Sequence, residues 1–287
     1  MQIGNDVILV MGATGRQGGA VARALVEHGH TVRAMTRKPE GEPARALAAL
    51  GVEVVQGDFD IAESLERAMR GVWGAFAVQN TWEAGVEREE EQGKRVADVA
   101  RATGVEHLVY SSVGSAHRLT GIPHFDNKWR VEEHIRGARF PSFVILRPVF
   151  FMENFVLPWF KPAIEEGKLT IGIKPDTPLQ MIAVRDIGAY GRIAFERHQA
   201  VNGRAIDIAG DTLTMPAAAA ILSKAAKRRV VFEPTPIEQV RQFSADFATM
   251  LEWFDRVGYE ADIEGTAREF GVAPTRFRDW GTGQVWS

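Results

Sequence analysis

The sequence predicts an α/β fold in which a doubly wound parallel sheet carries a smaller C-terminal α/β lobe. Over the first 150 residues, short β-branched runs alternate with amphipathic helical patterns, which is typical of a parallel sheet with helices on both faces. The first run leads at once into a glycine-rich turn and a helical pattern. The 287 residues, 45% hydrophobic and 25% charged, suffice for about two domains.

The elements of the first domain follow from local patterns. Short apolar runs of strand length are expected to form the sheet, at residues 6–12, 31–36, 52–58, 73–79, 107–112 and 143–148. Helical spacing of apolar residues predicts helices at 18–29, 42–51, 63–71, 87–104 and 127–137. Several of these end on glycine, which commonly follows a helix.

Beyond residue 150 the alternation changes. The patterns predict a strand entering a helix at 180–197, a strand at 203–210, a helix at 215–229, a short strand at 230–236 and one long helix at 237–258. We therefore expect residues 1–150 to form the sheet domain, with 181–212 returning to it. Residues 151–180 and 213–287 are expected to form the smaller lobe over the carboxyl edge of the sheet.

Composition narrows the classes of function. Lys and Arg number 34 and Asp and Glu 37, so the net charge is −3. This charge offers no basic excess for nucleic acid or an anionic membrane. The most apolar stretch, 141–160, is interrupted by charged residues and prolines, unlike a membrane helix. Cysteine is absent and the seven histidines are scattered, so we expect a soluble cytoplasmic protein without disulfides or a metal site.

The strongest motif is a glycine turn after the first strand. Gly12, Gly15 and Gly18 are spaced G-x-x-G-x-x-G and open the next helix. In such a turn the first glycine permits the tight bend, the second lets a pyrophosphate approach, and the third lets helix and strand pack closely. The free amides at the helix start would bind the phosphates. The motif predicts a dinucleotide site in a Rossmann domain; the alternative is a turn that only connects strand and helix.

The end of the second strand indicates which dinucleotide is bound. NAD-binding units usually place an acid there to bond the ribose 2′-hydroxyl. This chain has Thr36, Arg37 and Lys38 instead, and two cations favour the 2′-phosphate of NADP(H). Arg16 in the glycine turn could close over the same phosphate. The alternative is that these cations are simply solvated.

Further contacts are expected at the carboxyl ends of the other strands, where ligands of such sheets bind. These positions are occupied by Asp58 and Phe59 after the third strand, Gln79, Asn80 and Thr81 after the fourth, and Ser111 and Ser112 after the fifth. The carboxylate and ring of the first pair could flank the adenine. Each of these residues could equally be an ordinary loop residue.

Several segments resemble the NmrA-like family of atypical short-chain dehydrogenase/reductases. They are GATGRQGG (12–19), VVQGDFD (54–60), TWEAGVEREEEQGK (81–94), HFDNKWRVEEHI (124–135) and RPVFFMENF (147–155). The resemblance covers most of the chain, the last third only in general pattern. It implies a Rossmann domain and a small lobe with a cleft between them. It also implies cofactor contacts at Gly12, Thr14, Gly15, Gln17, Gly18, Arg37 and Lys128, and less specifically at Lys94.

One departure from related reductases bears on catalysis. Those enzymes place a tyrosine four residues before the lysine, so that both side chains share one helix face. Here His124 precedes Lys128, and a histidine beside a lysine charge would be mostly uncharged at pH 7 and a poor proton donor. Lys128 is expected to bind the cofactor; the alternative is a surface lysine paired with Glu132.

Other side chains could also act on a substrate. Ser111 or Ser112 could polarise a carbonyl, although a strand-end serine more often caps a backbone group. After the sixth strand, Phe151, Asn154, Phe155 and Trp159 could line an apolar pocket with one polar handle. The alternative for these four residues is a core between the lobes.

Three functions stay open. By resemblance, some family members sense NADP(H) without turnover, and others reduce quinones, dyes or phenylpropanoid ethers. The first hypothesis is an NADP(H) sensor that signals to a regulatory protein partner through the C-terminal lobe. The second is an NADPH-dependent reductase of an apolar carbonyl, quinone or imine, with His124, a serine or water supplying the proton. The third is an interaction module without cofactor. A homodimer is left open.

Overall fold

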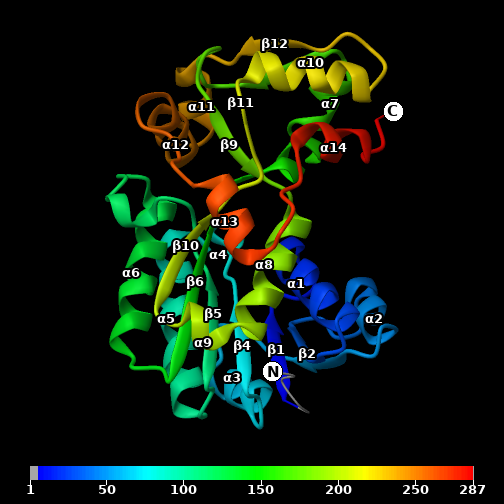
Figure 1. The fold of residues 1–287 in the computed structure, drawn as a ribbon. Coiled ribbons are helices and arrows are strands. Elements are labelled where there is room, and N and C mark those ends of the chain that lie inside the picture. Colours follow the sequence, from blue (N-terminus) through cyan, green and yellow to red (C-terminus); the bar gives the residue numbers. More distant parts are fainter. Residues whose placement is uncertain (1–5, 287) are drawn as a thin grey trace.

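The computed structural model describes residues 6–286 and contains a seven-stranded, all-parallel sheet (Figure 1). In spatial order its strands are β10 (Arg204–Ile208), β6 (Ser142–Pro148), β5 (His107–Ser111), β4 (Gly74–Ala77), β1 (Val7–Met11), β2 (Thr31–Thr36) and β3 (Glu53–Gln56). The strand order reverses between β1 and β4, where sheets of this kind bind their ligands. The predicted fold class is confirmed.

Helices cover both faces of this sheet. One face packs against α3 (Ala62–Met69), α5 (Val86–Ala102) and α6 (Pro123–Gly137). The other packs against α1 (Arg16–Glu27), α2 (Glu42–Ala48) and α8 (Val184–Glu196), which α9 (His198–Val201) follows. Two glycines of α8 bring it close to α1, since a Cβ on Gly188 or Gly191 would come within 2.7 Å of that helix.

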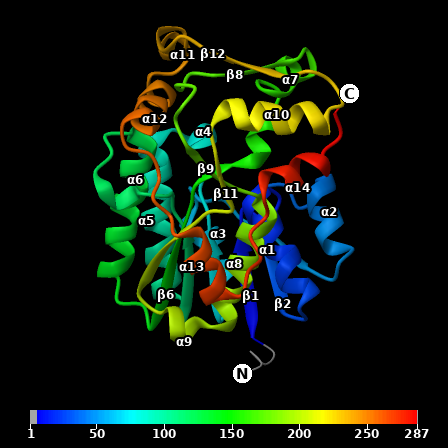
Figure 2. The same ribbon diagram turned by 45° about the horizontal axis from the view of Figure 1, so that its top comes forward.

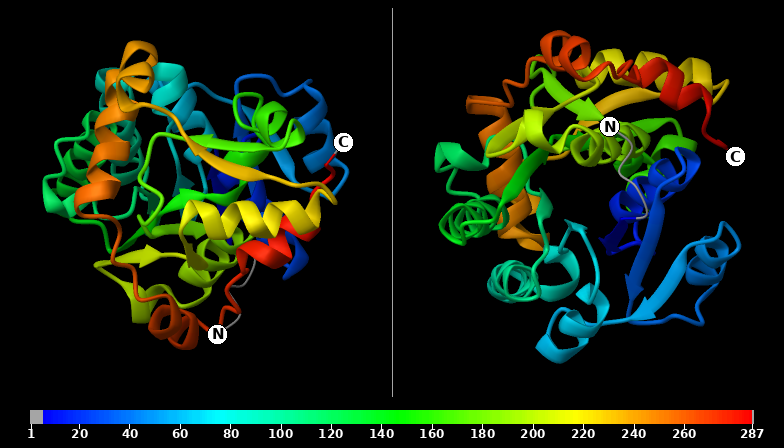
Figure 3. Two further views of the ribbon diagram at one scale, coloured as in Figure 1. Left: turned by 90° about the horizontal axis from the view of Figure 1, so that it is seen from above. Right: turned by 60° about the horizontal axis from the view of Figure 1, so that its bottom comes forward.

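The smaller lobe lies over the carboxyl end of the sheet (Figures 1 and 2). Its three-stranded sheet has the order β11 (Asp211–Leu213), β9 (Leu179–Ile182), β7 (Phe150–Phe151). A second pair consists of β12 (Val231–Pro234) and β8 (Lys168–Ile171). Its helices are α7 (Lys161–Glu165), α10 (Met215–Ala225), α11 (Ile237–Phe243), α12 (Ala245–Arg256) and α14 (Phe277–Thr282). Figure 3 shows this lobe from above, with α10 and β12 in front.

Short elements join the two parts. A helix of four residues, α4 (Thr81–Ala84), follows β4, and 3₁₀ turns span Ala116–Arg118 and Met152–Val156. Near the C-terminus, α13 (Ile263–Phe270) packs through Phe270 on the sheet-domain core, although the sequence division placed this segment with the lobe. Of the segment 181–212, α8 and β10 lie in the sheet domain. The strands β9 and β11 at its two ends belong to the lobe sheet.

Two of the differences from the predicted helix boundaries have a clear local cause. The single helix expected at 237–258 is wrong: it breaks at Ser244, whose backbone is extended and whose hydroxyl accepts from the amide of Phe247. Serine is a favoured N-cap, so a second helix starts there. Helix α6 begins at Pro123, earlier than expected, because proline suits the first helical turn. Within residues 6–286, no helix combines the length and apolar character needed to cross a membrane.

Candidate functional site

The glycine turn is shaped by backbone crowding. Gly12 has a φ of +64°, and a Cβ on Gly18 would lie 2.4 Å from the carbonyl oxygen of Gly12. The amide of Gly15 donates to that same oxygen at 2.9 Å. Gly15 caps α1 without a side chain, so amides of its first turn remain free to bind an anion. This cradle fits the pyrophosphate that the motif predicts.

A pocket opens beside the ends of β2 and β3. It has a volume of about 260 Å³ and is lined by Arg37, Gln56, Gly57, Asp58, Ile61, Ser64 and Arg67. The Arg37 guanidinium pairs with Glu83 of α4 at 2.7 Å. Within the described part of the chain, Arg67 makes no ion pair. The sequence analysis missed Arg67, and a search for cations at helical spacing from Ser64 could have found it.

The other residues predicted at this end have varied surroundings. The Asp58 carboxylate accepts from the amide of Asp60 at 3.0 Å, within the pocket wall. The Phe59 ring packs on the sheet-domain core, and Ile61, half exposed, lines the pocket in its place. The Lys38 side chain is exposed, while its amide donates to Thr36. Thr36 in turn lies 3.4 Å from Thr14, hydroxyl to hydroxyl.

Arg16 is exposed at the start of α1, and its charge lowers the pKa of the Glu153 carboxyl in the segment after β6. Burial raises the pKa of the Glu153 carboxyl, and hydrogen bonds from the amide of Val184 and the indole of Trp280 oppose this rise. Glu153 thus connects the start of α8, in the sheet domain, with α14 of the lobe. The sequence analysis had treated its neighbours as pocket residues.

Gln79 and Asn80, after β4, differ in their bonding. Gln79 is 4% exposed, and neither polar atom of its amide has a partner in the described structure. A buried amide of this kind is costly unless a ligand or water bonds it, so Gln79 fits a cofactor contact. Asn80 instead caps α4 through the amide of Trp82 at 3.1 Å and donates to Glu83.

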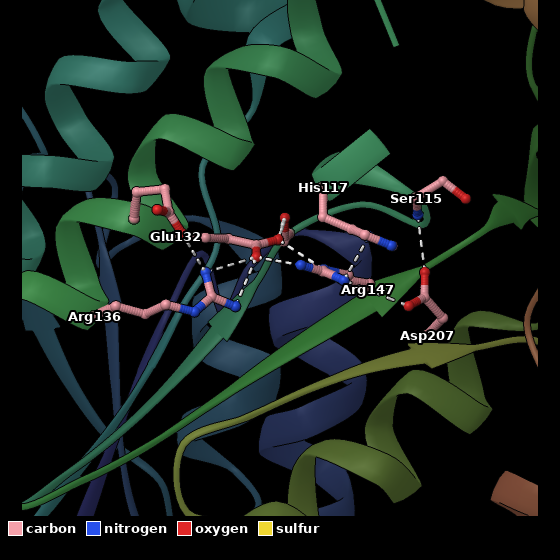
Figure 4. A network of polar contacts seen from close by, with 8 residues as sticks. Ser115, His117, Glu132, Arg136, Arg147 and Asp207 are labelled. Carbon is pink, nitrogen blue, oxygen red and sulfur yellow. Dashed lines mark hydrogen bonds and ion pairs between the residues drawn. The ribbon is translucent and has the colours of Figure 1, made fainter. Parts of the chain in front are cut away.

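Both serines after β5 have committed hydroxyls. Ser111 donates to Gln17 of α1 at 2.7 Å. Ser112 donates to Glu132 at 2.6 Å. Glu132 is fully buried and accepts from Arg147 at 2.9 and 2.6 Å (Figure 4). These bonds leave neither hydroxyl hydrogen free for a substrate.

The network in Figure 4 extends from Arg147 to two further groups. Arg147 donates to His117 at 2.8 Å and lies 3.6 Å from the Asp207 carboxylate. Because a guanidinium only donates, the His117 nitrogen must accept. The network therefore ties β6, β10 and α6 together next to the end of β5.

Lys128 pairs with Glu89, not with Glu132. Its ammonium lies 2.8 Å from a carboxylate oxygen of Glu89, which is 1% exposed. The pair lacks hydrogen-bond geometry, so the ammonium donors remain available to another acceptor. Asn127 donates to the other oxygen of Glu89 at 2.8 Å. The alternative of a surface lysine paired with Glu132 is wrong.

Two neighbours complete this end of α6. The Tyr110 ring, from β5, lies 5.8 Å from the Lys128 ammonium. Burial, followed by the charges of Glu89 and Glu132, raises the pKa of Tyr110 well above its ordinary value, so the phenol stays protonated. Lys94 pairs with Glu90 on its own helix at 2.5 Å.

His124 faces the lobe. Its Nδ1 lies 2.5 Å from the carboxylate of Asp246 on α12, and its ring lies 5.1 Å from that of Trp82. Because a carboxylate only accepts, Nδ1 carries hydrogen and Nε2 is the second functional nitrogen. The sequence analysis considered only the charge of Lys128 and missed Asp246. The separation of 122 residues leaves no local signal for this pair.

The four predicted substrate-pocket residues do not share one environment. Phe155 is fully buried in the lobe core, where its ring lies 5.7 Å from Phe160. Phe151 is half-buried and packs on the sheet-domain core, Asn154 is half-buried, and Trp159 is exposed. For Phe155 the structure favours the alternative of a core.

The sequence of this chain is similar to those of known proteins. Residues 4–278 match the NmrA-like family. An NmrA-like family domain-containing oxidoreductase of Cladobotryum sp. is 33% identical over 226 residues, 70% of this chain and 67% of the relative. A (4-alkanoyl-5-oxo-2,5-dihydrofuran-3-yl)methyl phosphate reductase of Streptomyces griseus is 32% identical over 285 residues, 96% of each chain.

Solved structures resemble the whole fold. NmrA, a negative transcriptional regulator solved in complex with NADP, has a TM-score of 0.80 at 24% identity, with 98% of this chain and 95% of that chain covered. Citrobacter sp. triphenylmethane reductase complexed with NADP(H) has a TM-score of 0.81 at 20% identity, with 96% and 98% covered. NmrA is also solved with NAD. The chain therefore belongs to the NmrA-like family and has the Rossmann-type fold of these structures.

Proposed function

We propose that this protein binds NADP(H) in preference to NAD(H) and senses the redox state of that cofactor, with weak or no turnover. Three features support the binding: the glycine turn before α1, the buried Gln79 amide without a hydrogen-bond partner among the described residues, and the pocket lined by Arg37. The absence of an acid after β2 supports the preference for the 2′-phosphate. Neighbouring folds solved with NADP(H) add to this support.

Each end of the cofactor has a defined set of residues. The amides of α1 would hold the pyrophosphate, and Arg37 with Arg67 would hold the 2′-phosphate. Lys128 would offer its ammonium to the nicotinamide ribose. The bound nicotinamide supplies or accepts a hydride, whereas the chain holds and orients it.

Weak turnover rests on one observation: the side chains that could donate a proton already have partners. Ser111 donates to Gln17, and Ser112 donates to Glu132. Lys128 faces Glu89 and is assigned to the nicotinamide ribose. A general acid must reach the substrate with a free proton, and neither serine has one in this arrangement.

The second candidate is a reductase of an apolar carbonyl, quinone or imine. The His124–Asp246 contact favours it, because a carboxylate on Nδ1 orients an imidazole for proton transfer at Nε2. The ring of Trp82 lies beside His124, and that of Phe247 lies 6.3 Å from Trp82; these rings suit a flat apolar substrate. In this reading the imidazolium form of His124 donates its Nε2 proton as the hydride arrives, which leaves the neutral imidazole with its hydrogen on Nδ1 against Asp246.

Two measurements test these proposals. Fluorescence titration should show tighter binding of NADPH than of NADH, and Arg37→Ala should remove the difference; equal affinities in the unmodified protein would refute the preference. NADPH consumption should stay at background across a panel of quinones, aldehydes and imines. Consumption that His124→Gln abolishes would replace the sensor with the reductase.

A redox sensor also needs a binding partner that responds to the state of its cofactor. We propose that a regulatory protein partner, or a second copy of the chain, contacts the C-terminal lobe. Its affinity should differ between the NADP⁺-loaded and the NADPH-loaded protein. Equal affinity in a titration with both forms would contradict signalling through this lobe.

A further inference from the structure

The residue opposite Arg37 is an acid of the same chain. Glu83 on α4 lies 2.7 Å from the Arg37 guanidinium, and the two side chains are 59% and 64% exposed. Its other carboxylate oxygen accepts from Asn80 at 3.3 Å. Glu83 therefore contacts both Asn80 and Arg37, the residue that the sequence predicts to bind the 2′-phosphate.

A cofactor with and without a 2′-phosphate should affect this pair differently. A phosphate monoester carries about −1.5 to −2 charge and three acceptor oxygens, so it outcompetes a carboxylate for a guanidinium. A 2′-hydroxyl is neutral and cannot. Arg37 is also one wall of the pocket beside β2 and β3.

Resting on the proposed NADP(H) binding, we propose that Glu83 competes internally with the cofactor 2′-phosphate for Arg37 and thereby limits the preference for NADP(H) over NAD(H). NADP(H) releases Glu83 from Arg37, whereas NAD(H) leaves the pair intact. Glu83 therefore weakens NADP(H) binding selectively. It makes the site a detector of which dinucleotide is bound.

The position of α4 links this exchange to the lobe. The residue next to Glu83 is Trp82, whose ring contacts those of His124 and Phe247. The short helix ends at Gly85, whose φ is +85° and around which a Cβ would meet nothing within 4 Å. Because α4 has only four residues between Asn80 and this glycine, release of Glu83 frees the helix to shift Trp82 against α12.

The decisive experiment compares Glu83→Gln with Glu87→Gln. Both acids are exposed, and Glu87 makes no ion pair among the residues described, so it controls for general charge. Dissociation constants for NADPH and NADH are measured by fluorescence titration at low and high salt. Glu83→Gln should tighten NADPH binding about two- to five-fold at low salt and leave NADH unchanged. Glu87→Gln should change neither cofactor selectively.

A double variant shows whether Glu83 acts through Arg37. In an Arg37→Ala background the Glu83→Gln effect should vanish. The proposal is overturned if the unmodified protein binds NADPH and Glu83→Gln leaves the NADPH-to-NADH ratio unchanged; the proposed function then still stands. If the unmodified protein binds no NADPH, both fail, and the titration of that protein alone shows it.

The link to the lobe has its own measurement. Tryptophan emission is followed on addition of NADP⁺ and of NAD⁺, in the unmodified protein and in Trp82→Phe. The Trp82 contribution, taken as the difference, should change with NADP⁺ and not with NAD⁺. An identical response to both oxidised cofactors would overturn the transmission by α4.

Discussion

Replacing Gly18 by alanine should displace the glycine turn from α1. The new Cβ would lie 2.4 Å from the carbonyl oxygen of Gly12, 2.5 Å from its carbonyl carbon and 2.8 Å from the carbonyl oxygen of Met11. Ordinary van der Waals contact begins near 3.4 Å, so the turn must move by 3.4 − 2.4 = 1.0 Å. All three obstacles are backbone atoms and cannot rotate away.

The magnitude follows from two opposing effects. Overpacking costs about 1–3 kcal/mol, and the helix preference of alanine over glycine returns at most about 1 kcal/mol. The net loss of about 0–3 kcal/mol corresponds to a fall in melting temperature of roughly 0–12 °C. Cofactor binding should suffer more, because the amides of α1 no longer align with the pyrophosphate. We expect at least about tenfold weaker NADPH binding, as a 1 Å misplacement is enough to lose that much.

The assay pairs NADPH titration with thermal unfolding and uses Gly137→Ala as control. Gly137 ends α6, and a Cβ there would meet nothing within 4 Å. That variant should bind NADPH as the unmodified protein does and unfold at the same or a higher temperature. Unchanged affinity in Gly18→Ala would refute the view that this close approach shapes the phosphate cradle.

Three further predictions follow. Arg67→Ala should weaken NADPH binding about tenfold and leave NADH unchanged, with Arg70→Ala as the neutral control; equal losses for both cofactors in a titration would exclude Arg67 from the 2′-phosphate site. Glu132→Gln should destabilise the fold by up to about 3–5 kcal/mol in urea unfolding, because the buried Arg147 guanidinium keeps, among the described residues, only Asp207, at 3.6 Å, as a charged partner, and a loss below about 1 kcal/mol would contradict this. Burial lowers the pKa of His107 to about 3, whereas in the unfolded chain the pKa of a histidine is about 6.5. The unfolded chain therefore binds the proton first, and the free energy of unfolding falls as the pH drops from about 6.5 toward 3, by about 2 kcal/mol at pH 5. If the stability of a His107→Gln variant keeps the same pH dependence, His107 does not cause this loss.

Local patterns were enough to predict the sheet domain. Its strands have the length and β-branched composition of buried strands, and its helices have the spacing of one apolar face. The glycine turn could be predicted for the same reason. Gly12 is required by its own backbone conformation, and Gly18 by backbone atoms only a few residues away along the chain. Arg37 followed from its place just beyond β2. All these features depend on neighbours along the chain.

The site partners could not be predicted, because they lie far apart in the sequence. Glu83 is 46 residues from Arg37, and Asp246 is 122 residues from His124. Many carboxylates in this chain of 37 acidic residues could have met either cation. The positions of α4 and α12 over the sheet determine which carboxylates lie close to Arg37 and His124.

The substrate pocket illustrates the same limit. An aromatic segment after a strand is equally consistent with a cleft or a core, because both need apolar side chains. Packing against Phe160 and the neighbouring rings buries Phe155 completely. The sequence by itself determined the Rossmann architecture and the glycine turn after β1, since short-range sterics and periodicity specify both. Only the tertiary structure decided which charges meet in the cleft, because ion pairs form between whatever side chains the packing of distant elements brings within reach.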